Sequence, residues 1–300
     1  MKVLANFAEI RKMTLRKLVK ALLPYGFVVL LLPSIRRYIN NRTPKKALAV
    51  AINLADNCNL NCKGCLTFST LVENPNYLDN EIFKRDMKRL GELCNKNISG
   101  MNLTGGEPLL NPNISEICNI SREHSTGRIE IRTNGLLLDS QPADFWEACR
   151  KNNIEIAVSS YPIKVNRSKI NEIAKFHAVK VFYLERDKTN QWSKFVLDID
   201  GKQDYKKSFY NCPHRCNLLH NGNIGVCAMV FTIERFNNYF KKNLIVDKND
   251  YINIYKAQSI DEILKFLSKP IKLCRYCNIQ KSNYYKDEWG ISKHLIEEWT

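Results

Sequence analysis

The sequence predicts an α/β fold in which repeated βα units form a parallel sheet or barrel. Two observations support this prediction. From residue 46 to residue 184, apolar runs of strand length alternate with segments whose apolar residues recur at helical spacing. The chain has 300 residues and is 44% hydrophobic, which is enough for one large core with a small appended module.

Strands and helices alternate regularly in this region. Strands are expected at 48–55, 98–103, 128–132, 154–159 and 179–184, and helices at 80–94, 114–121, 145–151 and 170–176. Loops at 56–65, 104–108 and 133–135 each follow a strand directly. Because active sites in such folds lie at the carboxyl ends of the strands, we expect these three loops to share one face.

After residue 186 the alternation stops, and two cysteine groups bracket an aromatic and basic segment. Asn221-Gly222 predicts a hairpin turn, and Ser259 to Glu262 form a capping box that opens a short helix. We therefore expect four parts. They are an N-terminal extension (1–45), a catalytic core (46–205), a cysteine-rich module (206–285) and a C-terminal tail (286–300).

The formal net charge of +16 is concentrated at the N-terminus. Residues 1–47 carry eleven Lys and Arg against one acid, Glu9, which gives a net charge of +10. The apolar run at 21–33 is too short for a comfortable transmembrane helix. Two interpretations stay open: an amphipathic anchor on anionic lipid at the inner membrane face, or a helix packed on the core. Neither a transmembrane domain nor nucleic-acid binding is expected.

Eight of the eleven cysteines fall in tight groups. A secreted protein built on disulfides is shorter and spreads its cysteines through small loops. Close grouping instead indicates metal ligation in a reducing cytoplasm. The other three, Cys94, Cys118 and Cys149, stand singly in apolar helical stretches and are expected to be buried.

The first group, Cys58, Cys62 and Cys65, has a C-x3-C-x2-C spacing and follows the first strand. A [4Fe–4S] cluster takes four ligands, so three thiolates leave one iron open. Catalytic metal sites keep a position free in the same way. A structural zinc site, the alternative, needs a fourth protein ligand, and no His or Cys follows at a suitable distance.

Together with Thr104-Gly105-Gly106-Glu107-Pro108 after the second strand, this loop resembles the signature of the radical S-adenosylmethionine (SAM) superfamily. The resemblance implies a partial (β/α)6 TIM-like barrel with a small C-terminal auxiliary-cluster subdomain. It also implies an enzyme that uses a [4Fe–4S] cluster and SAM. An electron from the reduced cluster cleaves SAM to methionine and a 5′-deoxyadenosyl radical, which abstracts a hydrogen atom from the substrate.

The same resemblance implies which residues bind SAM. Gly105, Gly106 and Glu107 correspond to the superfamily's GGE motif, which binds the amino group. Asn134 and Ser159 end the third and fourth strands, where the superfamily contacts the ribose and carboxylate. One departure is Gly64, which stands where the superfamily has an adenine-stacking aromatic residue before the third cysteine. Phe68 either substitutes for that ring or packs under the loop.

The second cysteine pattern is Cys212-x9-Gly222-x4-Cys227, followed by Cys274-x2-Cys277. It resembles the auxiliary module of the SPASM/twitch group in its shorter twitch form. The resemblance implies a second [4Fe–4S] cluster on these four cysteines, although four thiolates are also a common zinc set. Cys216 is a fifth cysteine in this region, and three roles stay open for it. It replaces Cys212 as a ligand, it is an inert thiol, or it donates a hydrogen atom to a substrate radical.

The substrate class is a separate expectation. The segment from Cys65 to Ser69, Leu109-Leu110 and the segment from Thr133 to Gly135 resemble radical SAM proteins of bacterial surface-polysaccharide biosynthesis. This implies epimerisation, dehydration or oxidation of a sugar or glycan precursor, and the basic clusters favour an anionic small molecule such as a nucleotide-linked sugar. The alternatives are maturation of a ribosomally made peptide or, in another class, a non-catalytic iron–sulfur or zinc protein that binds nucleic acid.

We also expect an electron donor such as flavodoxin or ferredoxin, and a cytoplasmic location. The candidate substrate contacts are polar or aromatic side chains expected near the strand ends or the cysteine-rich module: Tyr161, Lys164, Glu185, Arg186, His214, Arg215, His220 and Tyr276.

Overall fold

The computed structural model describes residues 46–184, 191–193, 196–284 and 286–300. The N-terminal extension, and with it the expected membrane contact, lies outside the described residues. Glu185 and Arg186, two of the candidate substrate contacts, also lie outside them.

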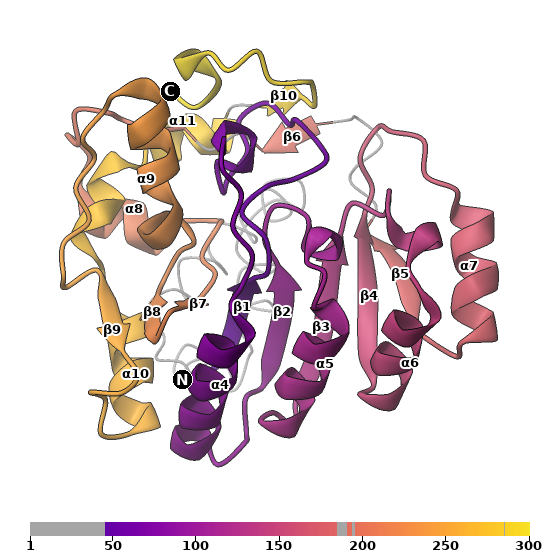
Figure 1. Ribbon diagram of the computed structural model, residues 1–300. Coiled ribbons are helices and arrows are strands. Elements are labelled where there is room, and N and C mark those ends of the chain that lie inside the picture. The colour runs from indigo at the N-terminus through magenta and orange to yellow at the C-terminus, as the bar shows by residue number, and fades with distance from the viewer. Residues whose placement is uncertain (1–45, 185–190, 194–195, 285) are drawn as a thin grey trace, which may run out of the picture.

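An eight-stranded sheet forms the centre of the protein (Figure 1). Five strands lie side by side and are parallel: β1 (Ala49–Asn53), β2 (Gly100–Thr104), β3 (Arg128–Thr133), β4 (Ile154–Ser159) and β5 (Val181–Leu184). On the other side of β1, β7 (Leu218–His220) is parallel to it, and β8 (Asn223–Gly225) and β9 (Tyr251–Asn253) continue the sheet antiparallel. The parallel strands confirm the expected α/β class with a partial barrel.

Four helices follow the first four strands and lie along one face of the sheet (Figure 1): α4 (Asn80–Cys94), α5 (Ile114–Glu123), α6 (Ala143–Lys151) and α7 (Arg167–Phe176). The buried strand residues Ile129, Ile131 and Val158 belong to the same apolar core as the inward sides of these helices. Burial of this apolar surface provides the main driving force for the layered packing.

The C-terminal half is built onto the same sheet. Asn221 and Gly222 have positive φ values of 45° and 73°, as a type I′ turn requires, and the hairpin they close adds β7 and β8 beside β1. The helical segments of this half are α8 (Tyr205–Asn211), α9 (Met229–Phe240), α10 (Ile260–Leu267), the 3-10 helix η4 (Lys272–Tyr276) and α11 (Ile279–Tyr284). The Ser259 hydroxyl caps α10 by accepting from the Glu262 amide at 3.3 Å, as predicted.

Smaller elements connect these parts. Strands β6 (Gln191–Ser193) and β10 (Lys286–Glu288) form an antiparallel pair apart from the main sheet. The remaining 3-10 helices are η1 (Ser69–Leu71), η2 (Pro108–Leu110), η3 (Leu138–Ser140) and η5 (Ile296–Glu298).

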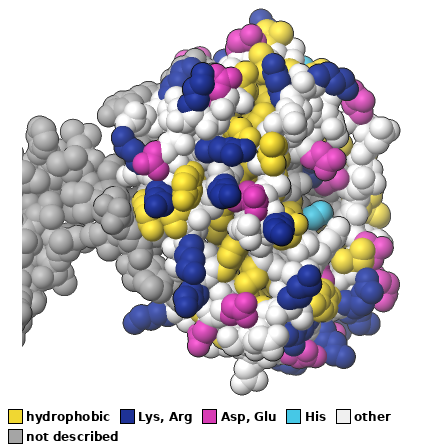
Figure 2. All heavy atoms as spheres, turned by 90° about the vertical axis from the view of Figure 1, so that its left-hand side faces the viewer, with side chains coloured by type: hydrophobic (Ala, Val, Ile, Leu, Met, Phe, Trp, Pro, Cys, Tyr) yellow, Lys and Arg dark blue, Asp and Glu magenta, His cyan; other side chains and the backbone are white. Residues whose placement is uncertain are grey.

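The surface of the C-terminal half carries both signs of charge. Figure 2 shows Lys and Arg side chains scattered among acidic and apolar ones, without a continuous basic stripe on this face. No helix in the described part of the chain is long and apolar enough to cross a membrane.

Candidate active site

The loops that follow β1, β2 and β3 meet at the carboxyl ends of their strands. The Glu107 amide donates to the Asn57 carbonyl at 2.9 Å, which joins the second loop to the first. The Asn134 side-chain amide donates to Asn59 Oδ1 at 2.7 Å, which joins the third loop to the first. These contacts confirm that the three loops share one face.

Two glycines allow the second loop to lie directly against the first. A Cβ on Gly106 would stand 2.0 Å from the Asn57 carbonyl oxygen, closer than any side chain tolerates. Gly105 has φ +140°, a backbone conformation that residues with side chains rarely adopt. The two glycines therefore let the backbones of the first and second loops lie in close contact, at the point where the resemblance places SAM.

Glu107 lies inside this junction, with 1% of its surface exposed. Its carboxylate accepts hydrogen bonds from Thr133 Oγ1 at 2.6 Å, the Asn134 amide at 2.9 Å and the Leu109 amide at 3.1 Å. Burial raises the pKa of Glu107 to about 7, although the hydrogen bonds oppose the shift. Glu107 thus ties the second loop to the end of β3, and its contact with SAM stays a prediction.

Cys58, Cys62 and Cys65 lie within electrostatic reach of one another. Burial raises the pKa of Cys58 to about 12, and the neighbouring Cys65 and Cys62 add to the increase. The Leu60 amide donates to Cys58 Sγ at 3.4 Å, as amides commonly do around cluster sulfurs. Among the described residues, the buried Asn57 Oδ1 has no hydrogen-bond partner, which leaves an acceptor for an ammonium group beside the triad. The three thiols fit a [4Fe–4S] cluster, and the Asn57 acceptor fits a SAM amino group next to it.

The structure corrects the interpretation of Phe68 as the adenine-stacking ring. Phe68 has 0% exposure and packs against Phe236 and Trp299, with ring centroids 5.6 and 6.3 Å away. A ring covered on all sides by protein stabilises the loop from beneath and does not present a face to a ligand. Phe68 therefore does not replace the aromatic residue that is missing at Gly64.

The C-terminal tail also belongs to this site, which the sequence pattern did not predict. Ile291 forms an antiparallel bridge with Cys62, and the Trp299 indole donates to the Cys65 carbonyl at 2.9 Å. The two tryptophans of this short segment, Trp289 and Trp299, were the one signal that it packs against something.

The second cysteine set comes together from separate elements. Cys212 ends α8, Cys227 follows β8, and Cys274 and Cys277 lie in and after η4. Burial raises the pKa of Cys277 well above its usual value, and Cys274, Cys227 and Cys212 raise it further. The four thiols are therefore close neighbours in a buried place. In the described part of the chain, no group of three or more His, Cys, Asp or Glu is arranged to hold a single metal ion.

Arg215 lies beside this second cysteine set. The nearby Cys212, Cys274 and Cys227 favour its charged form, while burial lowers its pKa overall. Its guanidinium stacks on Phe209 at 4.1 Å from the ring centroid. A buried cation is well placed here to offset the negative charge of four thiolates.

Three other candidate substrate contacts also belong to the C-terminal half. The His214 amide donates to Cys212 Sγ at 3.4 Å, and the His220 ring lies 5.4 Å from that of Phe231. Tyr276 is 5% exposed, and its hydroxyl accepts from the Ile245 amide at 3.1 Å. The His214 amide therefore supports the second cysteine set, whereas the contacts of His220 and Tyr276 indicate packing.

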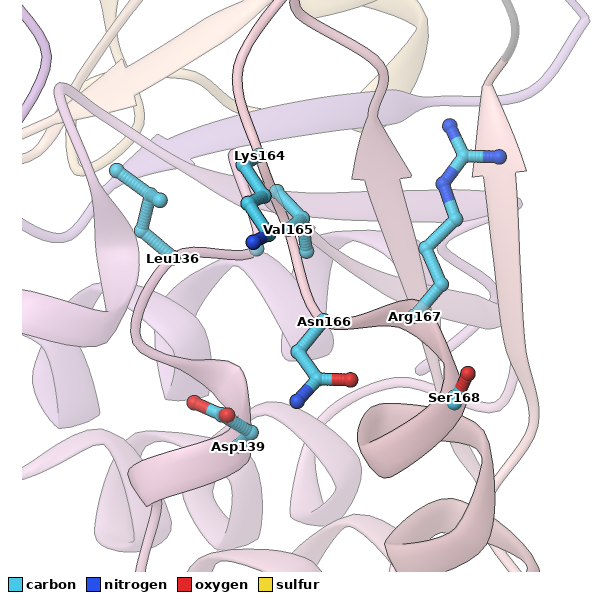
Figure 3. Close-up of a pocket in the computed structure, with 8 residues that line it drawn as sticks. Leu136, Asp139, Lys164, Val165, Asn166, Arg167 and Ser168 are labelled. Atoms are coloured by element: carbon cyan, nitrogen blue, oxygen red, sulfur yellow. The ribbon is translucent and has the colours of Figure 1, made fainter.

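Lys164 lines a pocket of 570 Å³ beside the loop that carries Asn134 (Figure 3). The wall of the pocket comes from the loops after β3 and β4 and from the start of α7. Its residues are Gly135, Leu136, Asp139, Lys164, Val165, Asn166, Arg167 and Ser168. Tyr161, from the same β4 loop, instead lies with its ring 6.2 Å from that of Trp289.

The sheet face opposite α4–α7 is charged. Successive side chains of a strand point to opposite faces. Because Ile129 and Ile131 belong to the helix-side core, Arg128, Glu130 and Arg132 share the other face of β3. By the same alternation Ser159 lies on this charged face, at the end of β4, whose Ile156 and Val158 point into the core.

Ion pairs connect these charges across three strands. Arg128 contacts Glu130 at 2.9 Å and Glu155 at 2.6 Å, and Lys180 contacts Glu155 at 2.6 Å. Arg132 Nε pairs with Glu130 at 2.6 Å, and the Arg132 side chain is 47% exposed. Among the described residues, the terminal amino groups of Arg132 make no ion pair or hydrogen bond. They are therefore available to an anionic ligand.

Cys216 lies close to Arg132. Burial raises the pKa of Cys216, and the Arg132 guanidinium opposes the increase. Cys216 also adds to the raised pKa of Cys227, so it lies near the second cysteine set as well.

Comparison with known proteins agrees with this geometry. Residues 52–182 match the family model described as "Radical SAM superfamily". A GTP 3′,8-cyclase of Synechocystis sp. is 34% identical over 89 residues, which are 29% of this chain and 26% of that protein. A 7-carboxy-7-deazaguanine synthase of Clostridium acetobutylicum is 36% identical over 88 residues, which are 29% of this chain and 38% of that protein. The chain therefore matches well under half the length of these curated relatives.

Among solved structures, one described as BtrN in complex with AdoMet and 2-DOIA is 17% identical, with a TM-score of 0.48 over 79% of this chain and 94% of that one. The region matched by the family model contains Cys58, Cys62, Cys65 and the glycine-rich loop at 104–108, the features that the three converging loops bring together. Residues 52–182 therefore form a radical SAM domain, and proteins of that superfamily use a [4Fe–4S] cluster and SAM.

Proposed function

We propose that this protein reductively cleaves SAM and uses the resulting radical to abstract a hydrogen atom from a small-molecule substrate. The observation that carries the proposal is the convergence of Cys58, Cys62 and Cys65 with the Glu107 and Asn134 loops on one sheet edge. In this proposal the three thiolates hold the [4Fe–4S] cluster. When bound, the cluster and SAM supply the electron transfer and the 5′-deoxyadenosyl radical.

The residues of the chain position SAM. Close backbone packing at Gly105 and Gly106 shapes the loop on which the amino group lies, and Glu107 fixes that loop to β3. Asn134 and Ser159 present polar groups at the ends of β3 and β4, where the ribose and carboxylate would bind. Glu107 is proposed to contact the SAM amino group, because its carboxylate accepts three hydrogen bonds from the protein and keeps a further acceptor position.

We further propose that Cys212, Cys227, Cys274 and Cys277 hold a second, twitch-like [4Fe–4S] cluster. Their mutual proximity in a buried place and the adjacent Arg215 cation support this assignment. The fold adds a structural reason, since the hairpin before Cys227 extends the same sheet that carries the first site.

For the substrate we propose an anionic sugar or glycan precursor that undergoes epimerisation, dehydration or oxidation. The charged face beyond the predicted SAM site supports an anion, because Arg132 pairs with Glu130 through Nε and its side chain is still 47% exposed. Cys216, beside Arg132, is the thiol that would return a hydrogen atom to a substrate radical. The curated relatives named GTP 3′,8-cyclase favour a second candidate, an anionic purine nucleotide. Peptide maturation stays a further alternative.

A flavodoxin or ferredoxin would supply the electron. We place the protein in the cytoplasm, where thiols stay reduced, with residues 1–45 as the candidate contact with the inner membrane face.

The decisive experiment measures 5′-deoxyadenosine formed from SAM by anaerobically reconstituted protein, with and without dithionite. We expect reductant-dependent product from wild type and none from Cys62→Ala, whose matched control is Cys94→Ala, a buried cysteine away from both sites. Iron analysis accompanies the assay, since about eight irons per chain supports two clusters and about four supports one. Cluster-replete wild type that forms no 5′-deoxyadenosine would contradict the proposal and leave the non-catalytic alternative.

A further inference from the structure

The C-terminal segment 289–299 is paired with the first cysteine loop through its backbone. The Lys63 amide donates to the Gly290 carbonyl and the Ser292 amide donates to the Asn61 carbonyl, each at 2.8 Å. The Asn61 side-chain amide adds a bond to the Ser292 carbonyl at 3.2 Å. The segment is therefore held in a fixed register on the loop.

This register places the Trp289 indole at a cysteine sulfur. Trp289 Nε1 lies 3.2 Å from Cys62 Sγ, well within the distance for a hydrogen bond to sulfur. An indole N–H donates and cannot accept, so the polarity of this contact is fixed. Cys62 is 6% exposed, which strengthens the electrostatic effect of a donor at its sulfur. The indole of Trp299, in the same segment, donates instead to the Cys65 carbonyl at 2.9 Å.

We propose that Trp289 is a positioning residue that sets the reduction potential of the first cluster through its hydrogen bond to Cys62. The inference rests on the proposed function, in which Cys62 is a ligand of that cluster. Reduction adds one negative charge, part of which is carried by the ligand sulfurs. A donor at a sulfur stabilises the reduced form more than the oxidised form and raises the potential. The segment 289–299 thus adds a side-chain donor at Cys62 Sγ to the amide donor that the loop provides at Cys58 Sγ.

The test is an anaerobic redox titration of the reconstituted full chain, followed by electron paramagnetic resonance. The signal that changes on addition of SAM identifies the first cluster. Trp289→Phe keeps an aromatic ring and removes the N–H. We expect its ratio of reduced to oxidised cluster at a fixed poise to fall roughly fivefold to tenfold, the effect of losing one charge-assisted hydrogen bond. Trp146→Phe, on α6, is the matched control and should keep the wild-type ratio, because its buried indole N–H has no hydrogen-bond partner among the described residues.

A second measurement requires no variant to fold. Wild type labelled with ¹⁵N in its tryptophan indoles should show a nitrogen hyperfine coupling to the reduced first cluster, and no such coupling overturns the inference. An unchanged ratio in Trp289→Phe with normal 5′-deoxyadenosine formation also overturns it and leaves the proposed function intact. Wild type that takes up no four-iron cluster at Cys58, Cys62 and Cys65 overturns both.

Discussion

The two cysteine sites are assembled in opposite ways. The first takes its thiols from one loop, between residues 58 and 65, and its supports from distant parts of the chain: Arg235 on α9 and the segment 289–299. The second takes its thiols from elements spread between residues 212 and 277, and its supports include the local caps of α8 and η4. A short motif therefore marks the first site but does not complete it.

Because of this difference, we expect the two sites to respond differently to the removal of one side chain. In the first site, removal of a distant side chain alters a loop that keeps its own cysteines. In the second, removal of one cysteine removes a link between α8, β8 and η4, whose apolar residues stay packed in the core. The following variants separate these effects.

Cys274→Ala should give the largest difference between the two cysteine sites. We expect the variant to lose about four irons per chain, the content of one cluster, while the SAM-sensitive paramagnetic signal of the first cluster remains. Cys216→Ala is the matched control and should keep the full iron content if Cys212, Cys227, Cys274 and Cys277 are the ligands. Loss of iron from Cys216→Ala would instead identify Cys216 as a ligand.

The regular part of the fold could be predicted from the sequence because its signal is local. The expected bounds of α4 and β4 agree with the structure residue for residue. Apolar spacing on one face and a capping Asp79, whose side chain accepts from the Ile82 amide at 2.8 Å, determine α4 without help from distant residues. The convergence of three loops also followed from strand order alone.

The details of the site could not be predicted in the same way. From the sequence, Phe68 could stack on adenine. Its burial depends on Phe236 and Trp299, which are far away along the chain. The tail carries no periodic pattern, so nothing local indicated that Ile291 bridges Cys62. Arg215 appeared as a loop cation, and only the fold shows that it faces three thiols. Each of these contacts joins residues that are distant in sequence.

The first site should also show a pH dependence that comes from the carboxyl group of Glu107. Burial raises the folded-state pKa of Glu107 to about 7, above the ordinary value of 4.5. The folded chain then keeps a proton that the unfolded chain has already lost. Stability from this group is therefore complete below pH 4.5, falls as the pH rises, and is fully reduced above pH 7, by about 3 kcal/mol.

Urea unfolding of the cluster-free protein between pH 4.5 and pH 8 measures this effect. In Glu107→Gln the titrating group is gone, so the free energy of unfolding should fall less over that range than in wild type. Asp204→Asn, which removes the carboxylate that caps α8, is a control whose slope should match wild type across this interval. Identical slopes in wild type and Glu107→Gln would show that the carboxyl group is already ionised at low pH.

The smallest expected effect tests the link between the two regions. Arg235 of α9 pairs with Asp56, directly before the first cysteine loop, and donates to the Thr67 carbonyl at 3.0 Å. The pair is partly buried, with side-chain exposures of 16% and 29%. Arg235→Gln should reduce the free energy of unfolding in urea by about 1–2 kcal/mol, because Asp56 loses its partner in a poorly solvated place. Glu234→Gln, an exposed neighbour on the same helix, should leave it unchanged. If both variants match wild type, α9 packs on the first loop through apolar contacts such as Phe236 with Phe68, and the ion pair only sets the register.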